Sequence, residues 1–565
     1  MHPSRSVVPS LLALAALVGA NSSGLLAQQP ALAADRAPGA AAVDVAQCKQ
    51  WLHTLAGPEF EGRGTGQPGY EKAANYVAAH FKALGLEARG ENGTYFQNMP
   101  WTMTAVDATK STLEFLANGK VVHSIPVDRL TGTCSSNFEA TGDVVFVRPT
   151  LTTVEPAAND GQAGGRRPRA SVKVEGLDGA ELKGKVVVVN LPPSDDRMAA
   201  AMGRFAVIRE LQGKECAVVL FAQKDAVSGG LRGRGGMGRG GGNRAAAGAG
   251  RSPFDGTFGG DDFTKLFTAA GSSVDGLQQM PATTAMPLQC KVHLEVAETQ
   301  APAMNVFAVL PGSDPQKKDE YVVIGSHLDH LGRNGDRISP GADDDGSGTT
   351  GVMAVAQMFA KNPQKPARSV LFVCFSGEES GLLGSGHFAK NCPIPLSSMV
   401  AELQMDMIGR DEEENMEGDK GEKAEDNRNS LHLIGTKKLA PALHDLCMAK
   451  NGTAKFDLEW DQEGMFSRSD HANFAKYGVP IAFFFTGLHK DYHQTTDTPD
   501  KIHYEKLLRV AQYVYDIGFE LGVQNGRPEI DSALWAKYSG KAGKEPAAPM
   551  SAGAKSDAGK PDGGK

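Results

Sequence analysis

The sequence predicts an α/β protein with a mostly parallel, twisted sheet flanked by helices and a small β-rich domain inserted into it. Two apolar runs rich in β-branched residues, Tyr321–Ile324 and Val370–Phe375, are typical of parallel strands buried on both faces. Between them, Gly348–Lys361 has the length and apolar content of a helix that connects one parallel strand to the next. Strand, crossover helix and strand in this order indicate a parallel sheet covered by helices.

The chain is long for a single domain, and its composition is that of a soluble globular protein. Its 565 residues predict two or three domains. Hydrophobic residues make up 41% and charged residues 22%, which is ordinary for a folded chain. The formal net charge of −8 argues against nucleic acid as a partner, because nucleic-acid-binding surfaces are basic. Seven cysteines without a CxxC spacing predict no particular disulfide.

Residues 1–33 predict a signal peptide and therefore an exported protein, periplasmic or extracellular. His2 and Arg5 precede the short apolar run VVPSLLALAALVGA, and Ala31-Leu32-Ala33 supplies small residues for cleavage. The alternative is an uncleaved anchor, which the shortness of the run disfavours. No later stretch reaches spanning length, so no stable membrane insertion is expected after the signal is removed.

Residues 43–120 are predicted to form the N-terminal part of the main domain. A helix is expected to begin near Val43, because the apolar residues that follow fall roughly on one face. After the turn-rich segment EFEGRGTGQPG, residues 69–88 predict a second amphipathic helix. Thr94–Met103 and Ser111–Phe115 are candidate strands.

Residues 121–295 change character and predict a separate domain inserted ahead of the main strands. Short strands alternate with loops and with one helix, Asp196–Leu211. Within this region, Gly229–Arg251 is a Gly/Arg-rich segment that cannot bury a core. Its arginines suit a polyanion, but a flexible solvated loop is the favoured interpretation. The predicted strands are Val144–Val147, Val186–Leu191 and Ala217–Phe221.

Residues 296–525 return to alternating strands and helices and complete the main domain. The acidic segment Arg410–Arg428 lacks the Gly and Glu placement of an EF-hand loop, so a solvated surface loop is expected. The Lys/Gly/Ala/Pro composition of residues 538–565 predicts a disordered tail. Further strands are predicted near Asn305–Val309, Met399–Met405 and Ile481–Phe485.

Histidines and carboxylates cluster where the predicted strands end, which is where ligands bind in open α/β sheets. Each follows an apolar run or lies in a Gly-rich turn. A mixed His/carboxylate set suits zinc, and an odd number with one shared carboxylate suits two ions. The five candidates are His327, Asp344, Glu379, Asp406 and His493.

Taken singly, these residues have ordinary structural explanations. A lone histidine near a strand is commonly structural, and GADDDGSG suits a turn with a helix N-cap. The pair Glu378-Glu379 suits a solvated surface, although carboxylates at the end of a buried strand are costly without a role. Five such residues in this order favour a hydrolytic metal centre.

The motifs resemble those of the di-zinc exopeptidase family that includes bacterial leucyl aminopeptidase, aminopeptidase Y and glutamate carboxypeptidase. The resemblance covers roughly residues 43–115 and 296–525. The inserted region is similar, more loosely, to a protease-associated domain through ELKGKVVVVNLP and the helix before CAVVLFA. The matching motifs are HLD (327–329), GADDDGSG (341–348), EE (378–379), DM (406–407) and YHQTTDT (492–498).

The resemblance implies a role for each residue. One zinc ion takes His327 and Asp406, the other takes Glu379 and His493, and Asp344 bridges them. Asp329 accepts the other ring N–H of His327 and fixes its tautomer. Glu378 is the general base that takes a proton from the zinc-bound water and passes it to the leaving amine.

One position departs from the family pattern. Some relatives carry a tyrosine three residues before the Ser-Asp-His segment, where it stabilises the oxyanion. Phe466 stands there in this chain and has no hydroxyl. Tyr492 and His471 are the alternatives, as are the metal ions alone.

The resemblance implies an exported two-zinc exopeptidase acting on peptide or protein substrates, with aminopeptidase favoured over carboxypeptidase. A carboxypeptidase needs a basic pocket for the substrate carboxylate, which the sequence does not reveal. Glutaminyl cyclisation at a single zinc and a non-catalytic binding role also remain open. HKDYH (489–493) carries Lys490 where a zincin needs glutamate, and no GxSxG serine-hydrolase elbow is evident.

Overall fold

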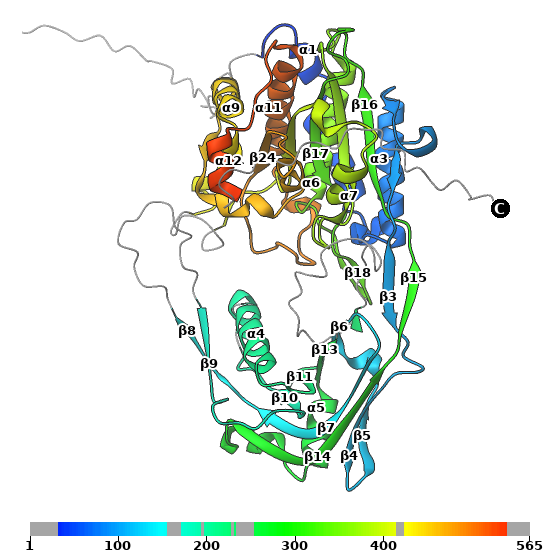
Figure 1. Cartoon of the computed structure of the whole chain (residues 1–565), viewed down its shortest axis with the longest axis vertical. Coiled ribbons are helices and arrows are strands. Elements are labelled where there is room, and N and C mark those ends of the chain that lie inside the picture. Colours follow the sequence, from blue (N-terminus) through cyan, green and yellow to red (C-terminus); the bar gives the residue numbers. More distant parts are fainter. Residues whose placement is uncertain are drawn as a thin grey trace, which may run out of the picture.

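The computed structural model describes residues 32–154, 171–193, 197–227, 231–232, 254–413 and 423–539. All but the last two residues of the predicted signal peptide lie outside these ranges. The same holds for most of Gly229–Arg251, for residues 414–422 of the acidic segment, and for the predicted tail from residue 540 onward. The described chain forms two bodies, each built around its own sheet (Figure 1).

The main domain contains a nine-stranded sheet, and the predicted α/β fold is confirmed. Its central strands β20, β17, β21 and β24 are parallel, while β16 and β22 flank them in antiparallel orientation. Every residue of β17, β20 and β21 is buried, which explains why these runs are almost uniformly apolar. Along the sheet the strands are β1 (Glu87–Ala88), β16 (Met304–Leu310), β20 (Ser369–Phe375), β17 (Tyr321–His327), β21 (Met399–Met405), β24 (Ile481–Phe485), β22 (Ser430–Ile434) and β23 (Asp457–Glu459), with β2 (Phe96–Asn98) paired to β16.

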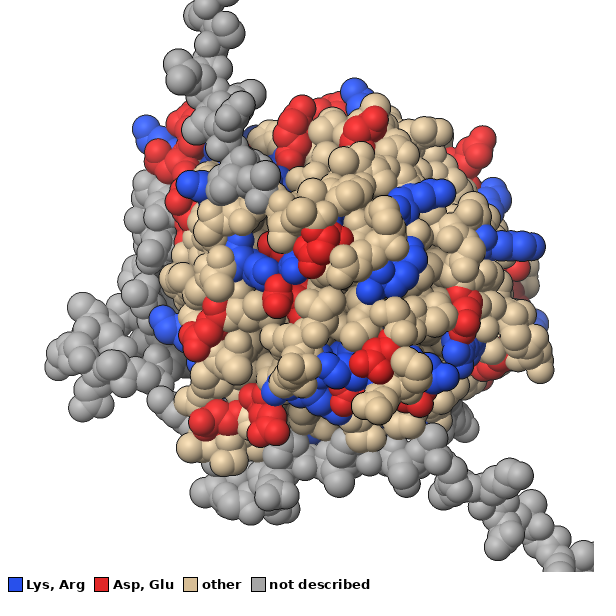
Figure 2. Space-filling model, turned by 90° about the horizontal axis from the view of Figure 1, so that it is seen from above, with Lys and Arg blue, Asp and Glu red and all other residues tan. Residues whose placement is uncertain are grey.

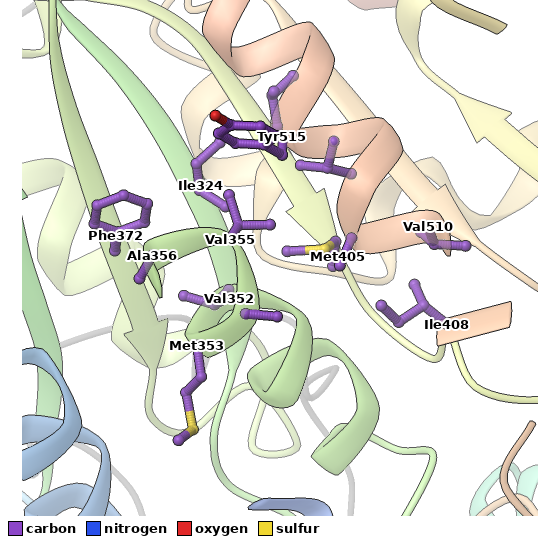
Figure 3. Close-up of a cluster of buried hydrophobic side chains, with 14 of the residues drawn as sticks. Ile324, Val352, Met353, Val355, Ala356, Phe372, Met405, Ile408, Val510 and Tyr515 are labelled. Carbon is purple, nitrogen blue, oxygen red and sulfur yellow. The ribbon is translucent and has the colours of Figure 1, made fainter. Parts of the chain in front are cut away.

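Helices cover both faces of this sheet. On one face, α6 and α11 pack against each other and against β17, with α2 and α3 beside them. Figure 3 shows this core, in which Ile324 and Phe372 of the sheet lie near Val355 of α6 and Tyr515 of α11. A second apolar cluster on the other face lies under α7, α8, α10 and α12. The helices are α1 (Ala37–Ala40), α2 (Val45–Leu55), α3 (Pro68–Ala83), α6 (Gly346–Lys361), α7 (Leu383–Asn391), α8 (Thr436–Leu439), α9 (Pro441–Ala454), α10 (His471–Ala475), α11 (Tyr504–Val523) and α12 (Ser532–Ser539).

The second domain has its own nine-stranded sheet and its own apolar core. Its helices are α4 (Arg197–Gln212) and α5 (Asp261–Ala269), and a separate ribbon pairs β8 (Thr150–Val154) with β9 (Ser171–Glu175). The sheet consists in order of β12 (Leu231–Arg232), β6 (Thr131–Cys134), β13 (Phe254–Gly259), β11 (Val218–Gln223), β10 (Val186–Val189), β7 (Phe138–Val147), β14 (Thr283–Leu294), β4 (Thr112–Ala117) and β5 (Lys120–Ile125).

The domain boundary lies earlier than the sequence predicts. The sequence assigned residues up to 120 to the main domain, but β4 pairs with β14 inside the second sheet. The reason is that the alternating pattern of β4 buries Leu113 and Phe115 in the core of the second domain. Two antiparallel strands, β3 (Thr102–Val106) and β15 (Val296–Gln300), form the connection between the domains (Figure 1).

The surface of the main domain mixes both signs of charge. Figure 2, which looks onto this domain from above, shows acidic and basic side chains interspersed over the face. Among the described residues, no helix combines the length and apolarity needed to cross a bilayer. All seven cysteines are free thiols, and Cys374 is a buried core residue of β20.

Candidate metal centre

The predicted site residues come together at the carboxyl end of the parallel strands. His327 is the last residue of β17, Asp406 follows β21 directly, and Glu379 follows β20 after a short turn. Asp344 lies just before α6, and His493 comes from the loop after β24. Five chain segments that are far apart in sequence therefore meet at one edge of the sheet.

His327 lies at one end of this cluster with two carboxylates around it. Its Nε2 atom is 3.4 Å from Asp344 Oδ1 and 3.5 Å from Asp406 Oδ1. Two ligands of one tetrahedral zinc ion are about 3.3 Å apart, given zinc–ligand bonds of about 2.0 Å. These three atoms have the spacing of zinc ligands.

His493 lies at the other end in an equivalent arrangement. Its Nε2 atom is 3.1 Å from Asp344 Oδ2 and 3.2 Å from Glu379 Oε2. Asp344 thus directs one oxygen toward His327 and the other toward His493. A carboxylate that faces two ligand groups with separate oxygens has the arrangement needed to bridge.

The three consecutive aspartates have separate roles, and only the middle one is free to face the cluster. Asp343 accepts the Gly409 backbone N–H at 2.8 Å. Asp345 accepts hydrogen bonds from backbone N–H groups at the ends of β17 and β21 and in the first turn of α6. Although Asp345 also lies near His327 and Asp406, its two oxygens are occupied by these bonds. Its donors are His327 (3.0 Å), Gly348 (2.9 Å) and Met407 (3.1 Å).

His330 belongs to the site and was missed by the sequence analysis. Its Nδ1 atom is 2.9 Å from Glu379 Oε1 and 3.5 Å from Asp344 Oδ2, and the side chain is buried. Neither ring nitrogen has a hydrogen bond in the described structure. The available signal was the spacing in HLDH, which places a second histidine directly after the motif that identifies His327.

The expected contact of Asp329 needs correction. The Asp329 carboxylate was expected to hold the free ring nitrogen of His327, but that carboxylate lies 3.9 Å from Nδ1. The Asp329 backbone carbonyl is the nearer acceptor, 2.9 Å from Nδ1. The carboxylate instead accepts the Glu378 backbone N–H at 3.1 Å, because the two residues follow the ends of the neighbouring parallel strands β17 and β20. Asp329 therefore orients both His327 and Glu378.

Glu378 lies beside the candidate ligands without belonging to either group. Its Oε2 atom is 4.0 Å from His327 Nε2, and the side chain lines the pocket above the cluster. Burial and the neighbouring carboxylates raise its pKa well above the usual value. A cation in the cluster would oppose both effects and favour the ionised form of this carboxylate.

Mutual charge compensation holds the site together. Burial and the nearby Asp344 charge raise the pKa of Glu379, but the close pairing of its carboxylate with the imidazoles of His330 and His493 outweighs them and lowers that pKa to about 2. Burial lowers the pKa of His493, and the carboxylates of Asp344 and Glu379 outweigh it and raise that pKa to about 10. The carboxylates Asp344 and Glu379 are thus ionised, the form in which they bind metals.

The pocket beside the cluster has both polar and apolar lining residues. Besides the cluster itself, its lining contains Tyr492 and Arg468, whose Nη2 donates a hydrogen bond to the Tyr492 hydroxyl over 3.3 Å. Tyr492 stacks on His493 with ring centroids 3.9 Å apart. His471 is fully buried against Phe483 and does not line the pocket, so Tyr492 is the better placed of the two oxyanion candidates. The apolar lining consists of Met407, Met465, Phe483, Phe485 and Leu488.

Comparison with known proteins finds that part of the chain is similar to a family of peptidases. The model of peptidase family M28 matches residues 305–517. A probable leucine aminopeptidase of Arthroderma otae is 28% identical over 230 residues, which cover 39% of this chain and 58% of that protein. Leucine aminopeptidase 1 of Coccidioides posadasii is 29% identical over 244 residues, covering 41% and 59% of the two chains. The matched part thus spans just over half the length of these curated relatives.

Solved structures with the same fold extend over most of the chain. An aminopeptidase from Aneurinibacillus sp. strain AM-1 covers 88% of this chain and 98% of its own, with a TM-score of 0.51 and 19% identity. A zinc aminopeptidase from Bacillus subtilis covers 87% and 98%, with a TM-score of 0.52 and 16% identity. These likenesses include the second domain and concern the fold alone.

Proposed function

We propose that the protein is a zinc-dependent aminopeptidase that uses two zinc ions, on the premise that residues 305–517 match the model of peptidase family M28. His327 and Asp406 would hold one ion and Glu379 and His493 the other, with Asp344 shared between them. The observation that carries the proposal is the position of Asp344, whose two oxygens lie 3.4 Å and 3.1 Å from the two histidine nitrogens.

The residues around the ions perform the proton transfers. When bound, zinc lowers the pKa of a coordinated water and polarises the scissile carbonyl. Glu378 takes a proton from the attacking water and delivers it to the departing amine. The Asp329 carboxylate accepts the backbone N–H of Glu378 over 3.1 Å. This hydrogen bond restricts the orientation of Glu378, the general base.

The pocket indicates the class of substrate. Its wall of methionine, phenylalanine and leucine side chains favours an apolar side chain on the residue that is released. The surrounding carboxylates attract the protonated amine at the substrate's N-terminus. A peptide with a free amine and an apolar first residue satisfies both conditions.

Arg468 gives a specific reason to test a second activity, carboxypeptidase. It lies on the pocket wall, where a guanidinium can bind a terminal carboxylate in bidentate fashion. In this structure it bonds to the Tyr492 hydroxyl, so a substrate carboxylate would have to compete for it. The larger number of carboxylates in the site favours the aminopeptidase.

Two matched substrates and a metal measurement distinguish these activities. One substrate carries a free N-terminal leucine and a blocked C-terminus, and the other has the reverse arrangement. We expect two zinc ions at the centre and chelator-sensitive cleavage of the first substrate only. Cleavage of the second substrate alone, lost in Arg468→Ala, would replace the proposal with a carboxypeptidase. Metal-free protein without turnover would favour a binding protein.

We also propose export, on the basis of residues 1–33. Expression with and without this segment, followed by fractionation, tests it. Mature protein found outside the cytoplasm and beginning near residue 34 is the expected result. Full-length protein in the membrane fraction would favour the uncleaved anchor.

A further inference from the structure

A second cluster of metal-ligand side chains lies at the far edge of the main sheet, outside the pocket. His432 on β22 is the register partner of Glu459 on β23. Glu412 approaches from the loop after β21, and Asp461 follows β23. Glu412, His432 and Glu459 each offer a ligand atom, and these atoms lie within 4.8 Å of one another.

The imidazole of His432 is held in one orientation by a carboxylate. Its Nε2 atom is 2.9 Å from Glu412 Oε2, and the other oxygen of Glu412 accepts a 2.8 Å hydrogen bond from the Gln462 side chain. With Glu412 as acceptor, the ring proton resides on Nε2 and the Nδ1 lone pair is directed away from it. A carboxylate behind a histidine in this way is the usual support for a metal-binding imidazole.

The opposite nitrogen of His432 is unpartnered and faces two more carboxylates. The His432 side chain is fully buried, and Nδ1 has no hydrogen bond within the described structure. It lies 3.1 Å from Asp461 Oδ1 and 3.5 Å from Glu459 Oε2. These distances bracket the separation of about 3.3 Å between two ligands of a tetrahedral zinc ion.

The charge balance of the cluster also calls for a cation. Among the described residues, His432 is the one side chain that pairs with Glu412, Glu459 or Asp461 as a potential cation. Within the described part of the chain, these three carboxylates therefore share at most one positive charge in a partly buried place, which is unfavourable without a further cation. The side chains of Glu459 and Asp461 are 26% and 25% exposed, so an ion has access from solvent.

We propose that this cluster binds a third divalent transition-metal ion, with zinc as the best fit. His432 Nδ1, Asp461 and Glu459 are its ligands, and Glu412 holds the imidazole. The nitrogen ligand disfavours calcium and magnesium, which take oxygen ligands. The inference is independent of the proposed function, because none of these residues belongs to the pocket.

The location suggests a structural role with an effect on the pocket. His432 is the register partner of Phe485 on β24, and their ring centroids are 5.7 Å apart. Phe485 lines the pocket beside the candidate metal centre. An ion bound to His432, Glu459 and Asp461 would link β22, β23 and the segment after β23. It would thereby stabilise β22, the strand that pairs with β24 and supports Phe485 in the pocket wall.

Zinc binding to the full-length protein, measured by equilibrium dialysis at saturating free zinc, tests the proposal. We expect Asp461→Asn and Glu459→Gln to bind one ion fewer than the wild type. Glu412→Gln should weaken the zinc affinity of this site about 10- to 100-fold without removing a ligand. Asp457→Asn is the matched control, since Asp457 lies on the same strand but accepts a hydrogen bond from Asn429. Far-UV circular dichroism establishes that each variant is folded.

The outcome separates this site from the one in the pocket. Asp344→Asn should lose zinc from the pocket and keep the ion at His432. Equal zinc content in the wild type and in both ligand variants would overturn the proposal and leave His432 as an imidazolium held by carboxylates. A wild-type ion that disappears in Asp461→Asn but survives in Asp344→Asn would support this site even if the two-zinc centre were wrong.

Discussion

The proposed reaction depends on individual side-chain groups, and the Glu378 carboxylate, as the proton acceptor, gives the most direct test. Replacing this carboxylate by an amide in Glu378→Gln keeps the shape but removes the proton acceptor. General-base catalysis contributes about 10²- to 10⁴-fold, so kcat should fall by about that factor while zinc content stays unchanged. Steady-state kinetics with metal analysis checks this. Glu379→Gln is the contrast, because it should lose metal as well as activity. Retained turnover in Glu378→Gln would remove the general-base assignment.

Tyr492 is a second test at this scale. Phe466 occupies the position where the family resemblance predicts, for some members, an oxyanion-stabilising tyrosine, and Tyr492 is the tyrosine that lines the pocket. In Tyr492→Phe the ring can still stack on His493, so only the hydroxyl is lost. If it stabilises the oxyanion, kcat should fall by about 10²-fold with little change in KM. Tyr477→Phe, outside the pocket, is the control. Unchanged kcat in Tyr492→Phe would assign the tyrosine to packing.

How far the sequence predicts the site also depends on single residues. Three site residues lie at or just after the ends of apolar runs: His327, Glu378 and Asp406. Because the ends of parallel strands meet at one edge of a sheet, the sequence pattern alone predicts that these residues lie close together. His330 and the backbone contact of Asp329 depend on how one short turn folds, and local pattern does not encode that. The division of labour within Asp343–Asp345 was equally hidden, because it depends on which backbone N–H groups surround each carboxylate.

At the scale of elements, a loop from the N-terminal region anchors two of the loops that carry site residues. The sequence predicts a turn-rich loop at EFEGRGTGQPG, yet Arg63 within it is completely buried. It donates hydrogen bonds to four carbonyl groups in three segments, including the loop that carries His330 and the one that precedes Asp344. The acceptors are Leu55 (2.8 Å), Leu328 (2.9 Å), Pro340 (2.8 Å) and Gly341 (2.7 Å).

Arg63→Met should therefore damage stability and metal binding together. Hydrogen bonds from a charged donor contribute about 1.5–3 kcal/mol each, so the loss of four should cost at least about 3 kcal/mol of unfolding free energy. Zinc affinity should fall as well, since two ligand loops lose their common anchor. Chemical denaturation and zinc titration measure both. Arg333→Met is the matched control, because its exposed pair with Glu61 contributes at most about 1 kcal/mol. Equal effects of the two substitutions would contradict this account.

At the scale of the whole molecule, the main domain carries the site, and the two-stranded ribbon of β3 and β15 joins the second domain to it. The sequence predicted both bodies, because the change from strand–helix alternation to short strands is visible in composition. It misplaced the first boundary because β4 is too short to reveal which sheet it joins. Only the long-range pairing with β14 settles that.

The ribbon allows the two bodies to be separated in an experiment. Val106 of β3 pairs directly with Val296 of β15, so residues 107–295 can be replaced by an Asn-Gly turn, which suits a two-residue hairpin. The cores of the two domains consist of different residues, so the shortened main domain should fold and bind zinc. It should also hydrolyse a small leucine substrate, because every residue assigned to the pocket lies outside the deleted segment. Circular dichroism, zinc analysis and kinetics test this. A folded, zinc-loaded main domain without activity would show that the second domain contributes to the site itself. An unfolded product would show that the two cores depend on each other.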